Sequence, residues 1–133
     1  MLAINMTTTS DILVIEDDPI MREALADWLH AAGYGVRAAP DGSAGLAAVK
    51  LAPPALVITD IHMPGMNGAA IISELTQHHP EVAVIAISGL FNSGRGVDAE
   101  SAIALGAARA LAKPFKRAEL LRAMAELLER PAP

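Results

Sequence analysis

The chain has 133 residues, a length typical of one domain, and its composition (53% hydrophobic, 19% charged) excludes an intrinsically disordered chain. Ten Lys and Arg residues against 15 Asp and Glu residues give a net charge of −5, which argues against nucleic-acid and anionic-membrane surfaces. The absence of cysteine excludes disulfide scaffolds, thiolate zinc sites and cysteine nucleophiles.

The first ten residues have neither the basic region nor the long apolar run of a secretory signal. No apolar run approaches the roughly 20 residues that span a bilayer. We expect a disordered tail at residues 1–10, a single domain at residues 11–130, no output domain and a cytoplasmic location.

The first expected strand, Ile12–Ile15, is a continuous apolar run, which is typical of a strand buried on both faces of a parallel sheet. Asp18 and Pro19 predict the N-cap and the first position of a helix that ends at Gly33. Helical spacing predicts one apolar face for this helix. That face consists of Ile20, Met21, Ala24, Leu25, Trp28, Leu29 and Ala32.

The same alternation of strand and helix continues along the chain. Further strands are expected at Tyr34–Ala38, Ala55–Thr59, Val82–Ile87 and Arg109–Ala112. Further helices are expected at Ser43–Ala52, from Gly68 to about His78, at Asp98–Leu105, and from Phe115 or Lys116 to Arg130. Five strands alternating with five helices predict an α/β fold, a (βα)5 doubly wound parallel sheet.

Polar residues follow four of the five expected strands. Glu16 and Asp17 follow the first strand, and Asp60 follows the third. Ser88 follows the fourth strand and Lys113 the fifth. Ligands of doubly wound sheets bind beyond the carboxyl ends of the strands, so we expect these side chains to form one site.

Three carboxylates about 5 Å apart repel one another by about 3 kcal/mol per pair at an effective dielectric constant near 20, so we expect a cation among them. Oxygen ligands suit Mg²⁺, with Mn²⁺ as a substitute. Lysine and hydroxyl groups bind phosphoryl oxygens, and a carboxylate can act as a nucleophile. The residues therefore predict a metal-assisted phosphoryl acceptor.

The chain resembles the receiver domain of two-component response regulators from about residue 10 to residue 130. Four motifs carry the resemblance: ILVIEDDP at 12–19, LVITDIHMPGMNG at 56–68, IAISG at 85–89 and LAKPF at 111–115. The resemblance implies a flavodoxin-like fold with a five-stranded sheet in the order 2-1-3-4-5. It also implies that Asp60 is the phosphoacceptor.

The resemblance further implies a metal site for Mg²⁺. Asp17 and Asp60 are expected to bind the ion directly, Glu16 through a water molecule, and His62 through its backbone carbonyl. Each of these residues matches the family motif at its own position in the chain.

Ser88 stands at the switch hydroxyl position and Lys113 at the phosphate-binding lysine, whose peptide bond to the following proline is expected to be cis. The family usually has Tyr or Phe at the position of Ala110, so the usual aromatic switch is not expected here. His62 and Leu90 stand where the family varies the lifetime of the phosphoryl group. The apolar Leu90 is expected to hinder the attacking water.

The resemblance implies a sensor histidine kinase or a histidine phosphotransfer protein as phosphoryl donor, and an unidentified protein or a phosphorelay as output. It also implies that the face formed by 98–105, 109–112 and the last helix can form a weak homodimer. Beyond its own phosphorylation and dephosphorylation we expect no enzymatic activity.

Three other readings are open. A receiver-like binding module that is never phosphorylated is compatible with Ala110. A haloacid-dehalogenase-like phosphatase uses an Asp-x-Asp motif after its first strand, whereas here the strand is followed by Glu16, Asp17 and Asp18. A flavodoxin would need a Ser/Thr-rich phosphate loop and flavin-stacking aromatics, which the chain lacks.

Overall fold

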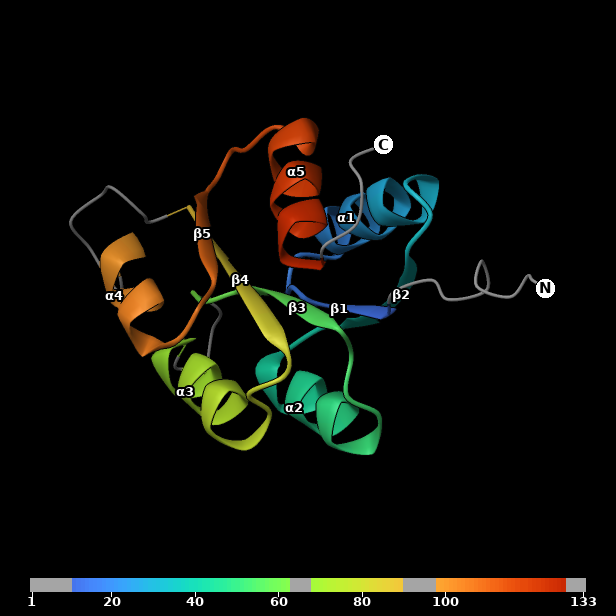
Figure 1. The fold of residues 1–133 in the computed structure, drawn as a ribbon. Coiled ribbons are helices and arrows are strands. Elements are labelled where there is room, and N and C mark those ends of the chain that lie inside the picture. The colour runs from blue at the N-terminus through green and yellow to red at the C-terminus, as the bar shows by residue number, and fades with distance from the viewer. Residues whose placement is uncertain (1–10, 63–67, 90–97, 129–133) are drawn as a thin grey trace.

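The computed structural model describes residues 11–62, 68–89 and 98–128, and these form one parallel sheet between two layers of helices (Figure 1). The strands are β1 (Asp11–Ile15), β2 (Gly35–Ala39), β3 (Leu56–Asp60), β4 (Ala83–Ser88) and β5 (Arg109–Ala112). The helices are α1 (Pro19–Ala31), α2 (Gly42–Leu51), α3 (Gly68–His78), α4 (Ala99–Leu105) and α5 (Arg117–Leu128). The strand order β2-β1-β3-β4-β5 confirms the predicted fold class.

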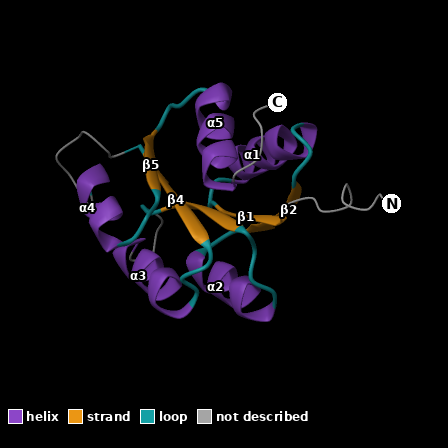
Figure 2. Ribbon diagram, in the orientation of Figure 1, coloured by secondary structure: helices purple, strands orange, loops and turns teal. Residues whose placement is uncertain are grey.

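Helices α1 and α5 cover one face of the sheet, and α2, α3 and α4 cover the other (Figure 2). Successive residues of a strand point to opposite faces. Ile12 and Val14 of β1 therefore pack with α1 and α5, whereas Leu13 and Ile15 pack with the helices of the opposite layer. All four side chains are fully buried, which explains why β1 is apolar without interruption.

The helix ends follow the predicted capping. The side chain of Asp18 accepts a hydrogen bond from the backbone N–H of Ile20 at 3.0 Å, and Gly33 has a φ of 94° just after α1. Helix α2 begins at Gly42, one residue before the predicted start, because Asp41 supplies its N-cap and accepts from the N–H of Ala44 at 2.8 Å.

Two predictions about individual residues of the helices are wrong. Ile20 was expected on the apolar face of α1, but its side chain is 81% exposed, whereas Leu25 and Leu29 of the same helix are fully buried in the core. The last helix begins at Arg117. Lys116 precedes it as the cap, because its backbone N–H donates to the Glu119 carboxylate at 3.4 Å while its carbonyl accepts from the N–H of Leu120 at 3.2 Å.

Some predictions lie outside the described residues, namely the disordered tail at residues 1–10, the role of Leu90 and the end of the last helix beyond Leu128. Within the described ranges, no helix combines the length and the apolar character needed to cross a membrane.

Candidate functional site

The three predicted carboxylates meet at the carboxyl ends of β1 and β3. These strands are paired with Ile15 opposite Thr59, so Glu16 follows β1 at the level of Asp60. One carboxylate oxygen from each of Glu16, Asp17 and Asp60 lies within 4.8 Å of the others. Glu16 and Asp60 are buried, whereas Asp17 is exposed, so the cluster opens to solvent on one side.

Lys113, directly after β5, joins two of these carboxylates. Its Nζ donates to Asp60 Oδ2 at 2.7 Å and to Glu16 Oε1 at 3.0 Å. The peptide bond between Lys113 and Pro114 is cis, as predicted. The three segments that carry these side chains are remote in sequence, and the order of the strands brings them together.

Backbone contacts fix the buried carboxylate of Glu16 and its chain segment. Glu16 Oε2 accepts from the backbone N–H of Asp18 at 3.2 Å, and the backbone carbonyl of Glu16 accepts from the Arg22 guanidinium at 2.9 Å. The contact from Arg22 was not predicted, because no sequence motif marks this residue.

Burial and charge pairing shift the pKa values of Glu16 and Lys113 in opposite directions. Burial raises the pKa of Glu16, against the lowering effect of the hydrogen bonds from Lys113 and from the N–H of Asp18. Burial by itself lowers the pKa of Lys113, but the hydrogen bonds to Asp60 and Glu16 outweigh it and the pKa is raised. Glu16 therefore holds its charge at a cost, and Lys113 stays protonated.

Replacing Glu16 with Gln is expected to raise the unfolding free energy by about 1 kcal/mol at pH 7 without divalent cations, since a buried charge is removed and the Lys113 acceptor kept. Because its folded pKa lies above 4.5, wild-type Glu16 holds a proton that the unfolded chain releases just above that pH. The contribution of Glu16 to wild-type stability should therefore fall as the pH rises through this window.

Urea unfolding at several pH values checks this prediction. Glu23→Gln, on the exposed surface of α1, is the matched control and should leave both the stability and its pH dependence unchanged. A Glu16→Gln variant that is less stable than wild type at pH 7 would contradict the account of this carboxylate.

His62 and Ser88 complete the site on the β4 side. The backbone N–H of His62 donates to Asp60 Oδ1 at 2.9 Å, and its ring Nδ1 forms a hydrogen bond with Ser88 Oγ. Ser88 is fully buried, and His62 is half-buried. The bond between the two side chains was not predicted from the sequence, because it depends on the rotamer of His62.

Ala110 lies in the middle of β5, where it pairs with Ala86 of β4. Together with Ala99 and Ile103 of α4 it lines a hollow of about 330 Å³ at the α4–β5 surface.

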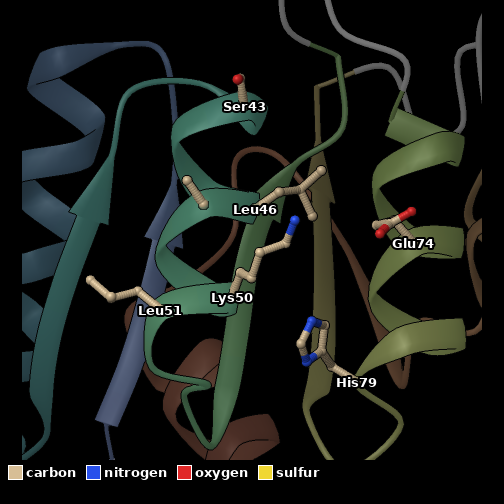
Figure 3. Close-up of a pocket in the computed structure, with 7 residues that line it drawn as sticks. Ser43, Leu46, Lys50, Leu51, Glu74 and His79 are labelled. Atoms are coloured by element: carbon tan, nitrogen blue, oxygen red, sulfur yellow. The ribbon is translucent and has the colours of Figure 1, made fainter.

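A second hollow, of about 580 Å³, lies between α2 and α3 (Figure 3). Lys50 and His79 extend into it, and Glu74 lies on the α3 side. No predicted site residue lines this hollow, so it is separate from the site at the carboxyl ends of the strands.

Comparisons with known proteins agree with this geometry. The family model described as the response regulator receiver domain matches residues 12–125. The transcriptional regulatory protein FixJ of Azorhizobium caulinodans is 34% identical over 127 residues, which are 96% of this chain and 59% of that protein. The response regulator protein FleR of Pseudomonas aeruginosa is 34% identical over 110 residues, 83% of this chain and 23% of FleR.

Solved structures give the same result. The receiver domain of NtrX from Brucella abortus has a TM-score of 0.82 and 36% identity, over 91% of this chain and all of that one. A CheY-like receiver protein from Methanospirillum hungatei has a TM-score of 0.83 and 25% identity, over 92% and 95%. The chain spans less than two thirds of the two curated relatives. It belongs to the response regulator receiver family of two-component signalling.

Proposed function

We propose that this receiver accepts a phosphoryl group on Asp60 from a phosphohistidine donor in a Mg²⁺-dependent reaction. The observation that supports this most strongly is the position of Asp60, whose Oδ2 lies 2.7 Å from Lys113 Nζ within a cluster of three carboxylates. Lys113 supplies positive charge beside Asp60, and the two further acids can hold a divalent cation with it, so the site is suited to a reaction that brings in more negative charge.

In the transfer, an Asp60 oxygen forms the new P–O bond while the P–N bond of the phosphohistidine breaks. The electron pair of that bond goes to the imidazole nitrogen of the donor, which takes up a proton. The chain contributes positioning and charge neutralisation, as phosphoryl transfer requires. The Lys113 ammonium group pairs with the phosphoryl oxygens, and the Ser88 hydroxyl donates a hydrogen bond to one of them.

The donor set fits Mg²⁺, because every predicted ligand is an oxygen and the exposed Asp17 leaves room for water. The family resemblance supports a water-mediated role for Glu16 and direct roles for Asp17 and Asp60, and the exposed Asp17 is the most accessible of the three. The backbone carbonyl of His62 is the fourth proposed ligand. Bound Mg²⁺ would supply positive charge for the incoming phosphoryl oxygens.

The donor in this proposal is a sensor histidine kinase or a histidine phosphotransfer protein. The phosphorylated receiver then passes the group on or presents an altered surface to another protein, and a weak homodimer through α4, β5 and α5 is one such use. Its only chemistry is its own phosphorylation and dephosphorylation.

The second candidate is a binding module that is never phosphorylated. Ala110 favours it, because receivers of this family usually carry Tyr or Phe there to couple the hydroxyl to the surface. The acids and Lys113 favour the phosphoacceptor, since an unused cluster of buried carboxylates would only destabilise the fold.

Incubation with Mg²⁺ and phosphoramidate, followed by intact-mass measurement, separates the two candidates. Wild type is expected to gain one phosphoryl group, and Asp60→Asn none, because a carboxamide is a far weaker nucleophile than a carboxylate. Asp27→Asn, on the exposed face of α1, is the matched control and should gain the group at the wild-type rate. Chelation of Mg²⁺ should suppress the adduct.

Two results would contradict the proposal. An unmodified wild type under these conditions would favour the unphosphorylated module, and equal adducts on wild type and Asp60→Asn would move the acceptor to another residue.

A further inference from the structure

His62 contacts Asp60, which would carry the phosphoryl group, and Ser88, whose hydroxyl lies on the β4 side of the site. Its backbone N–H donates to Asp60 Oδ1 at 2.9 Å, and its ring Nδ1 is hydrogen-bonded to Ser88 Oγ. The backbone nearby is held by the sheet, where the N–H of Ile61 donates to the carbonyl of Ile87 at 3.1 Å. The distance between acceptor and hydroxyl is therefore fixed through this residue.

The chemistry of a hydroxyl gives this contact a direction. Ser88 Oγ has one proton to donate and lone pairs that accept. If the ring accepts the Ser88 proton, that proton points away from Asp60. If the ring carries its own proton on Nδ1, it donates to Ser88 Oγ, and the Ser88 proton can then point to a phosphoryl oxygen on Asp60 rather than to the ring.

On β5, the residue paired with Ser88 is Ala112, whose side chain is a methyl group and can form no hydrogen bond. Ser88 is fully buried, so its orientation is set by protein groups rather than by bulk water. A ring on the acceptor loop that binds Oγ directly is well placed to set it.

We infer that His62 is a positioning residue, whose ring donates from Nδ1 to Ser88 Oγ and thereby directs the Ser88 proton to the phosphoryl group on Asp60. This inference rests on the proposed function, because it concerns the same transfer. It assigns to the His62 side chain a role distinct from that of the backbone carbonyl in the metal site.

Substitutions at residue 62 separate this role from a structural one. Asn carries an N–H donor at the δ position, as His62 does, whereas Gln carries its amide one carbon further out and Leu has no donor. The rate of adduct formation with phosphoramidate and Mg²⁺ is measured by intact mass for His62→Asn, His62→Gln and His62→Leu, each with and without Ser88→Ala. Thermal unfolding of each variant confirms that it is folded.

We expect His62→Leu and His62→Gln to lower the rate by roughly tenfold, the factor that corresponds to one hydrogen bond involving a charged group. His62→Asn should keep a rate near that of wild type. In the Ser88→Ala background, His62→Leu should cause no further loss, because the group that it positions is absent.

Other outcomes overturn the inference. A wild-type rate in His62→Leu, equal losses in His62→Leu and His62→Asn, or full additivity with Ser88→Ala would each show that the ring does not act through the hydroxyl. If wild type forms adduct normally in these cases, the proposed function stands and only the role of His62 fails. If wild type forms no adduct, both fail together.

Discussion

Replacing Lys113 with Met is expected to lower the unfolding free energy by about 3 kcal/mol at pH 7 without divalent cations. The substitution leaves the carboxylates of Glu16 and Asp60 buried without their cation, since Lys113 Nζ lies within 3.0 Å of an oxygen of each. It should also slow adduct formation on Asp60 by roughly 100-fold, the scale for loss of a charge that stabilises the transition state.

Urea unfolding and intact-mass kinetics measure the two effects. Lys116→Met, which replaces an exposed lysine in the same segment, is the matched control. It should change the unfolding free energy by no more than about 0.5 kcal/mol and leave the rate of adduct formation unchanged. Lys113→Arg keeps the charge and should retain most of the stability. If Lys113→Met unfolds at the same urea concentration as wild type, the ion pairs of Lys113 with Glu16 and Asp60 contribute nothing to the unfolding free energy.

The pH dependence of this effect has a definite sign. The pKa of Lys113 is raised above 10.5 in the folded protein, so its contribution is fully present below that pH. The contribution is lost as the pH rises through the folded pKa. The stability difference between wild type and Lys113→Met should therefore narrow in alkaline solution above about pH 10.5.

The second large effect is expected at Gly68, the first residue of α3. A Cβ at this position would overlap the backbone carbonyl oxygen and the Cβ of Ile61, which lies between Asp60 and His62. Gly68→Ala should therefore lower the unfolding free energy by about 3 kcal/mol, at the upper end of the cost of overpacking. It should also slow phosphorylation, because any shift of Ile61 moves the acceptor.

Gly89→Ala is the matched control for this substitution. A Cβ at Gly89 would have Lys113 Cβ as its nearest neighbour at 4.0 Å, which is ordinary contact. Thermal unfolding should place Gly89→Ala near wild type and Gly68→Ala well below it. Equal midpoints for Gly68→Ala and wild type would show that α3 can move away from β3 without loss.

The fold and the members of the site were predictable from the sequence for a local reason. Apolar runs ended in Glu16, Asp60, Ser88 and Lys113, and parallel strands bring their carboxyl ends to one edge. Asp18 before Pro19 marked the start of α1 correctly, since capping depends on neighbouring residues alone.

What the sequence did not reveal depends on contacts between distant segments. Whether Ile20 is buried depends on what packs against the first turn of α1, which apolar spacing does not encode. The bond between His62 and Ser88 depends on a rotamer, and the overlap that excludes a side chain at Gly68 depends on the approach of α3 to β3. Each is a relation between two elements rather than a pattern within one.

The most direct test of the central claim is to locate the phosphoryl group chemically. An acyl phosphate is reduced by borohydride to an alcohol, so wild-type protein treated with phosphoramidate and Mg²⁺ can be reduced and its peptides sequenced by mass spectrometry. We expect homoserine in place of aspartate at residue 60 and at no other acidic residue. Reduction at Asp17 instead, or an intact-mass adduct with residue 60 unchanged, would contradict the assignment.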